Sequence, residues 1–412
     1  SVGYDLAKSA QVINNTEEEL TLSAINSSSG EFDIVGWQSL PITIGSLDSR
    51  YIGLQFLHTS TGSKSVTTQF DLEPFNNDGF IAATAVAYDL PSGDILVPTD
   101  FSTIQLALDI IPSSVEKTVV VEPGEYFENI MLRRIRNVTI RSQSGPLQTI
   151  INGGGSDIVI NSDHSNRAGG ITFEGFTITG GVGGAIDVYH TDNNITLKNL
   201  IISGNHGQGP DRSFNIVTVN PENTTLENVL IADNQHVGGT LDENYPAALD
   251  ISGNGAEGQS VKIINSTIVN NKDMAGVRVN NWGNEASVIF LNSVIWGNDQ
   301  NIIVHSSGSP YIYIDQSMVY NASSIMDAGS AGTLTLNNCI DQYPYFNNPE
   351  NGDYSLSQYS PLIAAGVMQG SVVPGLDISL VAPSTDILGN SRPSPSGSNP
   401  DIGAYENSSS EI

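Results

Sequence analysis

From about residue 118 onward, short runs of alternating apolar and polar residues follow one another, separated by turns rich in Asn and Gly. Strict alternation over four to eight residues is typical of a strand that buries one face. Four segments share a longer pattern, in which an Asn is followed by mostly apolar residues and by a second Asn six positions on. The Asn pairs are Asn199 and Asn205, Asn228 and Asn234, Asn265 and Asn271, and Asn292 and Asn298. This repeat predicts a solenoid with one coil per copy.

Degenerate copies flank these four and extend the series. The copies start at residues 175, 199, 228, 265, 292, 316 and 337, so successive steps are 24, 29, 37, 27, 24 and 21 residues long. An Asn amide both donates and accepts hydrogen bonds, and Asn tolerates a left-handed backbone at a coil corner. The recurring Asn residues are therefore predicted to form ladders between coils. The longest step predicts an overhanging loop at residues 236–246.

Residues 1–92 show shorter alternating runs, such as 51–56, 66–72 and 80–86, and the turn Asn76-Asn77-Asp78-Gly79 predicts a hairpin. Five to seven such strands predict a β-sandwich. The order of an Asn-Asn-Thr turn before Leu20, the strand Phe32-Asp33-Ile34 and the later Asn-Asn-Asp-Gly turn resembles immunoglobulin-like domains of the ASPM/SPD-2/hydin type. This resemblance implies a spacer or anchor domain.

One helix is predicted, at residues 101–111. Phe101, Ile104, Leu108 and Ile111 recur at helical spacing, and Ser102 with Gln105 reads as a capping box. A short amphipathic helix before the first coil would cover the open end of the solenoid, whose unpaired edge otherwise invites aggregation. We therefore expect it to form an N-terminal cap.

Two further segments resemble known families. Residues 101–155, with the runs S-T-I-Q, V-E-P-G-E-Y and T-I-I-N-G-G-G, resemble the opening coils of pectin-lyase-like right-handed β-helix proteins. The motifs at 351–356, 360–366, 386–390 and 400–406 resemble the C-terminal region of bacterial β-helix surface proteins of the choice-of-anchor Q type. These resemblances imply an all-β, secreted protein. The expected domains are a sandwich at 1–92, a right-handed parallel β-helix at 93–340 and a C-terminal closing region at 341–412.

The amino-acid composition narrows the classes of binding partner that the chain can have. The chain has 15 Lys and Arg against 44 Asp and Glu, a net charge of −29, which excludes nucleic acid and anionic membranes as partners. Calcium remains open as a bridge between acidic surfaces. No apolar run is long enough to insert in a membrane. The lone Cys339 is interpreted as a small core residue, and the start at Ser1 and the polar tail suit export.

A strand precedes each Asn repeat, and its period-two pattern predicts two outward columns. One holds Asp187, Val217, Asp250, Arg278 and Ile303, and the other holds Tyr189, Val219, Ser252, Asn280 and His305. Asp187 and Asp250 would lie roughly 9.6 Å apart, near the upper limit for the carboxylates of an inverting glycoside hydrolase. Alternatively, Arg278 would remove an α-proton from a uronate, as Arg or Lys does in pectin-lyase-like enzymes. The non-catalytic interpretation is a cross-strand ion pair of Asp250 with Arg278 on a solvated face.

Basic residues are sparse and unevenly placed. Residues 156–340 hold only six Lys or Arg, scattered over several coils, which argues against a lyase acting on acidic sugars. Four arginines instead gather near the capped end, at Arg133, Arg134, Arg136 and Arg141. They form either a solvated turn or a surface that meets an acidic face of another copy head to tail.

The histidines give a weaker pattern. His206 and His236 each follow the closing Asn of a repeat and are expected to stack at one corner, where with Asp233 they would either lie on the surface or bind a metal.

The sequence favours a non-catalytic structural or adhesive surface protein that binds copies of itself or extracellular glycans, with Tyr189 and His305 as binding residues. The alternative is a polysaccharide lyase or glycoside hydrolase using Asp187, Asp250 and Arg278.

Overall fold

The computed structural model divides into two compact units, residues 1–92 and 93–412. It describes residues 6–14, 16–27, 32–35, 41–56, 62–73, 79–165, 167–192, 194–208, 215–237, 245–253, 258–281, 287–304, 310–320 and 333–407. Each unit is described by itself below. The helices in the described part of the chain are all too short or too polar to cross a bilayer.

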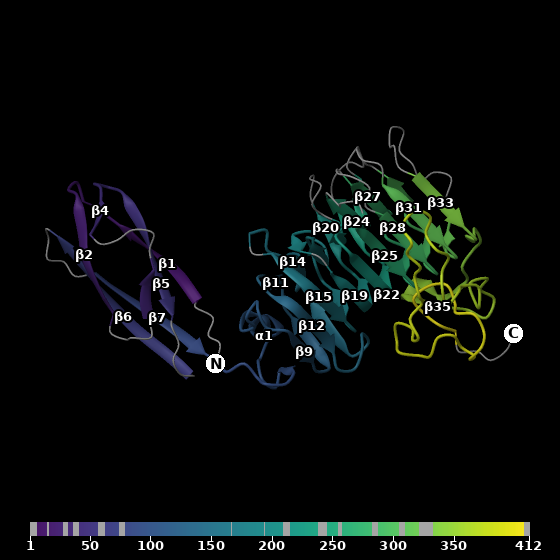
Figure 1. The fold of residues 1–412 in the computed structure, drawn as a ribbon, viewed down its shortest axis with the longest axis horizontal. Helices are drawn as coiled ribbons and strands as arrows, with labels where there is room; N and C mark the ends of the chain where they lie inside the picture. Colours follow the sequence, from purple (N-terminus) through teal and green to yellow (C-terminus); the bar gives the residue numbers. More distant parts are fainter. Residues whose placement is uncertain are drawn as a thin grey trace. The chain divides into compact units, whose positions relative to one another are not determined.

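The first unit contains two antiparallel sheets (Figure 1). One sheet has the order β1 (Leu6–Ile13), β5 (Ser49–Phe56), β3 (Phe32–Val35), and the other has the order β4 (Ile42–Ile44), β2 (Leu20–Ser27), β6 (Gly62–Glu73), β7 (Gly79–Ala87). β6 and β7 form the predicted hairpin, with Phe70 opposite Gly79. The tip of its turn, at 74–78, lies outside the described residues.

The second unit is a parallel β-helix whose coils contribute strands to three faces (Figure 1). The strands of the first face are β8 (Ile95–Val97), β9 (Lys117–Val121), β12 (Arg136–Ser142), β15 (Ala168–Glu174), β19 (Thr196–Ser203), β22 (Thr224–Ala232), β25 (Ser260–Ile264), β28 (Ser287–Leu291), β31 (Tyr311–Asp315) and β33 (Thr333–Asn337). Each pairs in parallel with its neighbour, as a solenoid requires.

β19 and β22 continue through the corner into the second face. The other strands of that face are β10 (Gly124–Phe127), β13 (Thr149–Asn152), β16 (Thr177–Thr179), β26 (Thr267–Val269), β29 (Val294–Trp296) and β32 (Met318–Val319). The third face is a seven-stranded sheet of β11 (Ile130–Leu132), β14 (Ile160–Ser162), β17 (Ile186–Val188), β21 (Val217–Val219), β24 (Ala247–Gly253), β27 (Ala275–Asn281) and β30 (Gln300–Val304). Two short strand pairs, β20 (His206–Gln208) with β23 (Gln235–Val237) and β34 (Phe346–Asn348) with β35 (Asp353–Leu356), and the two-residue β18 (Thr191–Asp192), complete the strands.

Stacked apolar side chains fill the interior. On the first face one inward column runs without interruption through eight coils, and each member is fully buried: Val119, Ile140, Phe173, Leu197, Leu226, Ile263, Phe290 and Ile314. Period-two alternation in parallel strands places equivalent residues directly above one another. The alternating runs in the sequence therefore predict the core correctly.

The predicted Asn ladder is present at the closing Asn of the repeats. Asn205 donates to Asn234 at 3.1 Å, Asn234 to Asn271 at 3.0 Å and Asn271 to Asn298 at 2.9 Å. The starting Asn residues have left-handed backbones, with φ of 51° at Asn199 and similar values at Asn228, Asn265 and Asn292. In the last copy the left-handed residue is Asn338, so the predicted start at 337 is wrong by one position.

Cys339 is half-buried at the end of a polar column. The hydroxyl of Ser266 accepts from Val229 N in the coil before it. In the same way the Ser293 hydroxyl accepts from Ser266 N, and the Ser317 hydroxyl accepts from Ser293 N. Each serine therefore links two neighbouring coils. The Cys339 thiol contacts the carbonyl of Ile314 at 3.4 Å. Burial raises the pKa of this thiol, consistent with an inert structural residue.

The cap helix α1 (Ile104–Asp109) begins later than predicted. Its N-cap is Thr103, whose hydroxyl accepts from Leu106 N at 3.1 Å, so the predicted capping box of Ser102 with Gln105 is wrong. Glu128 supplies the second cap because its two carboxylate oxygens accept from the Ile104 and Gln105 N–H groups at 2.9 Å. A carboxylate from the first coil thus anchors the helix against β11, in a way that local sequence does not reveal.

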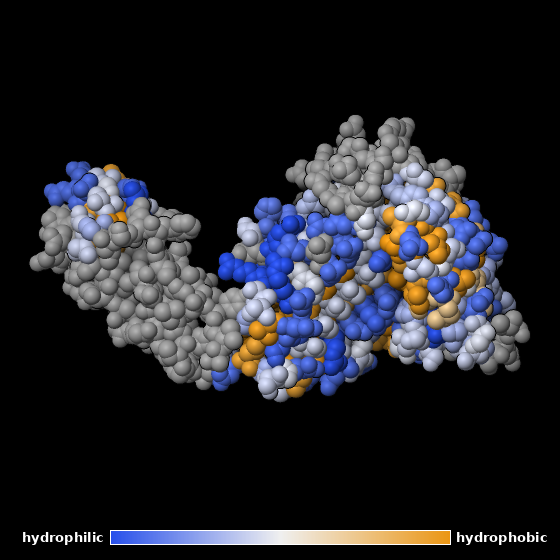
Figure 2. Space-filling model, in the orientation of Figure 1, coloured by the Kyte–Doolittle hydropathy of each residue, from blue (hydrophilic) through white to orange (hydrophobic). Residues whose placement is uncertain are grey.

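The C-terminal region does not close the end of the β-helix. It runs back along the outside, where Leu362, Ile387 and Ile402 pack on outward residues of the second face such as Leu230 and Val294. A second apolar cluster joins it to the first face through Val373 and Leu380. Figure 2 shows apolar surface near β28 and β31, where the C-terminal region crosses the β-helix.

The ion pair of Arg392 with Glu406 fastens this region. Arg392 Nε lies 2.9 Å from Glu406 Oε2, and both side chains are fully buried. Arg392 Nη1 also donates to Asn228 Oδ1 at 2.6 Å. In the ladder formed by the starting Asn residues, this oxygen is the acceptor to which Asn265 of the next coil would donate. The guanidinium thus replaces Asn265 as the donor at this step. The C-terminal region is therefore part of the second unit and covers its lateral surface.

Candidate functional site

The predicted catalytic residues lie in one column on the third face, with one change of register. Parallel pairing places Asp187 beside Thr218, Thr218 beside Asp250, and Asp250 beside Arg278. Val217 pairs with Ile186 and is buried, so its predicted outward position is wrong. Ile216 and Val217 are both apolar, and the run of alternation therefore did not determine which of them begins the strand.

The second predicted column shifts in the same coil. Because Val188 pairs with Val219, the residue that follows Tyr189 in the column is Asn220, and Val219 is buried. Asn220 Nδ2 donates to Tyr189 O at 3.4 Å. Ser252 and Asn280 pair as predicted. His305 lies outside the described residues.

Asp250 and Arg278 form the predicted ion pair, although its surroundings differ from the prediction. Arg278 Nε lies 2.6 Å from Asp250 Oδ1, and Arg278 Nη1 donates to Tyr245 O at 2.7 Å. The other carboxylate oxygen accepts from Asn215 Nδ2 at 3.1 Å and from Ser252 Oγ at 2.5 Å. The side chains of Arg278 and Asp250 are only 6% and 3% exposed. The prediction of a solvated face is therefore wrong at this point.

Three partners in this network were not predicted from the sequence. Ser252 follows Asp250 by two positions, so the period-two rule that placed both outward was a sufficient signal for their contact. Asn215 and Tyr245 come from the segments that enter β21 and β24, and no local pattern places Asn215 beside Asp250 or the Tyr245 carbonyl beside Arg278. Together with Ser252 they hydrogen-bond both members of the buried ion pair.

Asp187 lies at the other end of the column, two strands from Asp250. Its Oδ1 accepts from Tyr189 N at 2.9 Å. Burial raises the pKa of this carboxyl, and the negative charge of Asp250 raises it further, while the Tyr189 N–H lowers it. A carboxyl with a raised pKa is the type of group that serves as a general acid. Asp187 is the member of the column that fits a chemical role.

The four clustered arginines are largely neutralised within the chain. Arg136 lies 2.6 Å from Asp192, Arg141 lies 3.4 Å from Asp94, and Arg133 lies 3.8 Å from Asp163. These three side chains are 46%, 40% and 55% exposed. Arg134 has a left-handed backbone, with φ of 59°, at the turn before β12. The cluster is thus a mixed surface of both charges rather than an unpaired basic patch.

The histidine prediction is wrong by one position. His206 pairs with Gln235, and His236 pairs with Gly207, so the two imidazoles do not stack in register. His236 is buried, and Asp233 instead accepts from the Tyr354 hydroxyl at 2.6 Å. Within the described ranges, no three His, Cys, Asp or Glu side chains are grouped so that they could hold a metal ion.

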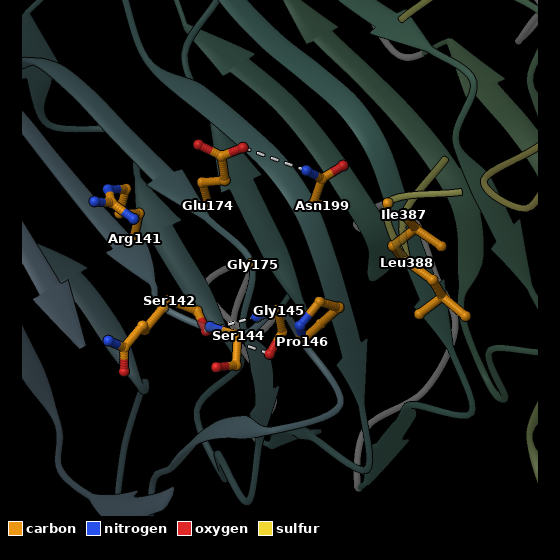
Figure 3. Close-up of a pocket in the computed structure, with 12 residues that line it drawn as sticks. Arg141, Ser142, Ser144, Gly145, Pro146, Glu174, Gly175, Asn199, Ile387 and Leu388 are labelled. Atoms are coloured by element: carbon orange, nitrogen blue, oxygen red, sulfur yellow. Dashed lines mark hydrogen bonds between the residues drawn. The ribbon is translucent and has the colours of Figure 1, made fainter. Parts of the chain in front are cut away.

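A pocket of about 430 Å³ lies elsewhere on the β-helix (Figure 3). Its walls are the turn after β12, Glu174 and Asn199 on the next two strands, and residues 387–389 of the C-terminal region. Asn199 Nδ2 donates to Glu174 Oε1 at 3.3 Å, and Arg141 also lines the pocket. Asp187, Asp250 and Arg278 do not line this hollow.

Comparison with known proteins gives no family: no family model matches the chain, and no curated protein matches it. Among solved structures, pectate lyase Pel9A is 15% identical, with 76% of this chain and 96% of that one covered, at a TM-score of 0.36. Pectin methylesterase PemA from Erwinia chrysanthemi is 10% identical, with 60% and 94% covered, at 0.30. SSP-19 from Caenorhabditis elegans, an MSP-domain-like protein, is 13% identical, with 20% and 88% covered, at 0.17. The parallel β-helix is established by the strand pairing itself.

Proposed function

We propose that this chain is a non-catalytic protein of the cell exterior, in which the β-helix is a rigid structural or adhesive rod that binds glycans or copies of itself. The observation that carries the proposal is the burial of the Asp250 and Arg278 pair. These are two of the three residues on which a polysaccharide-cleaving reaction at the third face would depend. Both are committed to contacts within the chain.

The chemistry of the pair supports this conclusion. The Arg278 guanidinium donates from Nε to Asp250 and from Nη1 to Tyr245 O, and its side chain is 6% exposed. A sugar therefore cannot reach Arg278 to give it a proton. Asp250 accepts hydrogen bonds on both oxygens and is 3% exposed, so it cannot activate a water beside a polymer. Removal of either residue would leave an uncompensated buried charge, which is a structural reason for their presence.

The extracellular part of the proposal is supported by the C-terminal motifs that resemble choice-of-anchor Q surface proteins, and by the N-terminal resemblance to spacer domains of the ASPM/SPD-2/hydin type. The net charge of −29 agrees with a surface that repels polyanions and anionic membranes. Neutral glycans are partners that this charge does not repel, whereas two copies of the chain carry the same net charge and could meet only through a local surface that is not acidic, such as the arginine cluster.

The second candidate is a polysaccharide lyase or glycoside hydrolase. It is favoured by one observation, the raised pKa of Asp187, which lies two strands from Asp250. In this alternative Asp187 would protonate the leaving oxygen of a glycosidic bond. This alternative lacks the second carboxylate that the reaction needs, because Asp250 is paired with Arg278.

The two candidates are separated by incubating the full chain with a panel of neutral and acidic polysaccharides and measuring new reducing ends and unsaturated products. We expect wild type to release neither above a protein-free blank. The variants Asp187→Asn and, as a matched control, the exposed Glu116→Gln are run beside it. Turnover by wild type contradicts the proposal, and its loss in Asp187→Asn alone would assign the activity to the third face.

A further inference from the structure

Two exposed tyrosines flank a buried proline where the C-terminal region first leaves the β-helix. Tyr343 and Tyr345 are 52% and 49% exposed, whereas Pro344 between them is buried. The two rings lie 4.9 Å apart, so both project from the same side of the chain. Tyr343 and Tyr345 thus point outward on either side of the buried Pro344.

These rings continue into a chain of aromatic contacts. The Tyr343 and Tyr345 rings have centroids 4.9 Å apart at an angle of 78°, and Tyr343 meets Trp296 at 5.1 Å and 84°. Trp296 is half-buried at the end of β29 and also contacts Phe346, which packs on the buried Tyr354. The exposed rings are therefore supported from below by the apolar cluster of the second face.

The backbone at this point is held in an unfavourable conformation. Tyr345 has φ of +50°, and it is the one aromatic residue among the described positions with a left-handed backbone. A bulky side chain destabilises this conformation, and such strain clusters at binding and catalytic sites. Two hydrogen bonds maintain it, from Ser360 Oγ to Pro344 O at 2.5 Å and from Ser357 N to Tyr345 O at 2.9 Å. The backbone that carries Tyr345 is thus held in place, and the ring contacts with Tyr343 and Trp296 restrict the side chains.

Rigid, half-exposed aromatic rings suit a ligand with an apolar face and a polar rim. A pyranose sugar has this character, because its axial C–H groups form an apolar face while its hydroxyls point outward. The ring of a tyrosine can pack on the apolar face of the sugar, and its hydroxyl can hydrogen-bond to the sugar hydroxyls. Tyrosine also loses little conformational entropy on binding. The net charge of −29 and the exposed Asp341 nearby in the chain disfavour an anionic sugar.

We infer that Tyr343 and Tyr345, set nearly at right angles to each other and supported by Trp296, form an aromatic corner that binds a neutral oligosaccharide of pyranose units. The inference rests on the proposed function, since it names the partner of a non-catalytic rod. It places the partner on the outside of the second face, away from Asp187 and the third face.

The experiment measures the affinity of the full chain for cellohexaose, laminarihexaose, xylohexaose and mannohexaose by titration calorimetry, with hexagalacturonate as the anionic comparison. We expect at least one neutral hexasaccharide to bind, and the double variant Tyr343→Ala/Tyr345→Ala to weaken it at least tenfold. The double variant Tyr343→Phe/Tyr345→Phe keeps the rings and is expected to stay within about threefold of wild type. The matched control is Tyr359→Ala, which removes a 74% exposed tyrosine outside the aromatic corner.

Three results would overturn the inference: no binding of any neutral hexasaccharide by wild type, binding of hexagalacturonate alone, or unchanged affinity in a folded double alanine variant. The last result would leave a glycan-binding rod with its site elsewhere. None of them bears on whether the chain cleaves polysaccharides, which the turnover assay tests separately.

Discussion

Arg278 and Asp250 are 28 positions apart in the sequence, yet their side chains meet at 2.6 Å across the adjacent strands β27 and β24. A parallel β-helix produces such contacts in every coil, because one turn of the chain returns to the same position one strand higher. Here the contact is buried, and both carboxylate oxygens of Asp250 accept hydrogen bonds. Two residues that read as catalytic in the sequence are thus explained by the stability of the coil that contains them.

Breaking this pair should destabilise the β-helix strongly. Asp250→Asn and Arg278→Met each leave one buried charge without its partner, which costs about 3–5 kcal/mol of unfolding free energy. The double variant should lose clearly less than the sum, because it leaves neither charge behind. Denaturant unfolding of the four proteins gives the coupling energy. Additive losses would show that the two side chains do not depend on each other.

The Asn ladder should be similarly sensitive at its centre. Asn234 is 1% exposed, donates to Ile202 O and Asn271 Oδ1, and accepts from Asn205. Asn234→Ala leaves these groups unsatisfied and should cost about 2–4 kcal/mol of unfolding free energy. The exposed Asn351→Ala is the control, expected within about 0.5 kcal/mol of wild type. Equal stability of the two variants would mean that the ladder does not stabilise the coils.

Local periodicity predicted the features that depend on alternation within a strand. It placed Asp250 beside Arg278 and stacked the closing Asn residues, because both follow from period two and a constant repeat. It misplaced Val217, where two adjacent apolar residues fit either register. Errors of one position at His236 and at the last repeat have the same origin, since corner residues follow no alternation.

Contacts between distant segments could not be predicted in this way. Arg392 reaches Asn228 across 164 positions of sequence, and nothing near either residue signals that contact. The C-terminal region was therefore expected to close the end of the β-helix, whereas it packs along the side. The buried surroundings of the Asp250 and Arg278 pair were missed for the same reason, because Asn215 reaches Asp250 from the coil before it and Tyr245 O accepts from Arg278 of the coil after it.

The stability of the β-helix should depend on pH through Asp401. Burial raises the pKa of this carboxyl to about 6 from 3.8, and the nearby Glu406 charge adds to the effect. The folded state therefore holds the proton more tightly, so this stabilisation is complete below about pH 4 and is lost as the pH rises through 6.

The unfolding free energy of wild type minus that of Asp401→Asn should accordingly fall, by on the order of 2 kcal/mol, between about pH 4 and about pH 7. The exposed Asp89→Asn should show no such trend relative to wild type. If the difference between wild type and Asp401→Asn instead rises with pH, folding lowers the pKa of Asp401 rather than raising it.

Head-to-tail assembly through the clustered arginines remains a prediction. Arg133 and Arg136 pair with carboxylates of their own chain, but exposed pairs of this kind are worth only about 0.2–1 kcal/mol and a neighbouring copy can replace them. Arg133→Glu/Arg136→Glu should then lower the weight-average mass in sedimentation at low salt. An unchanged sedimentation profile would show that this surface does not mediate self-association.

The accessibility of Arg278 tests the central claim most directly. The intact protein is treated with phenylglyoxal, and each arginine is followed by mass spectrometry of its peptides. Arg133, with a 55% exposed side chain, should be modified rapidly, while Arg278, at 6%, should stay as unreactive as the fully buried Arg392. Modification of Arg278 at the rate of Arg133 would contradict the claim, since it would show a guanidinium that solvent, and therefore a substrate, can reach.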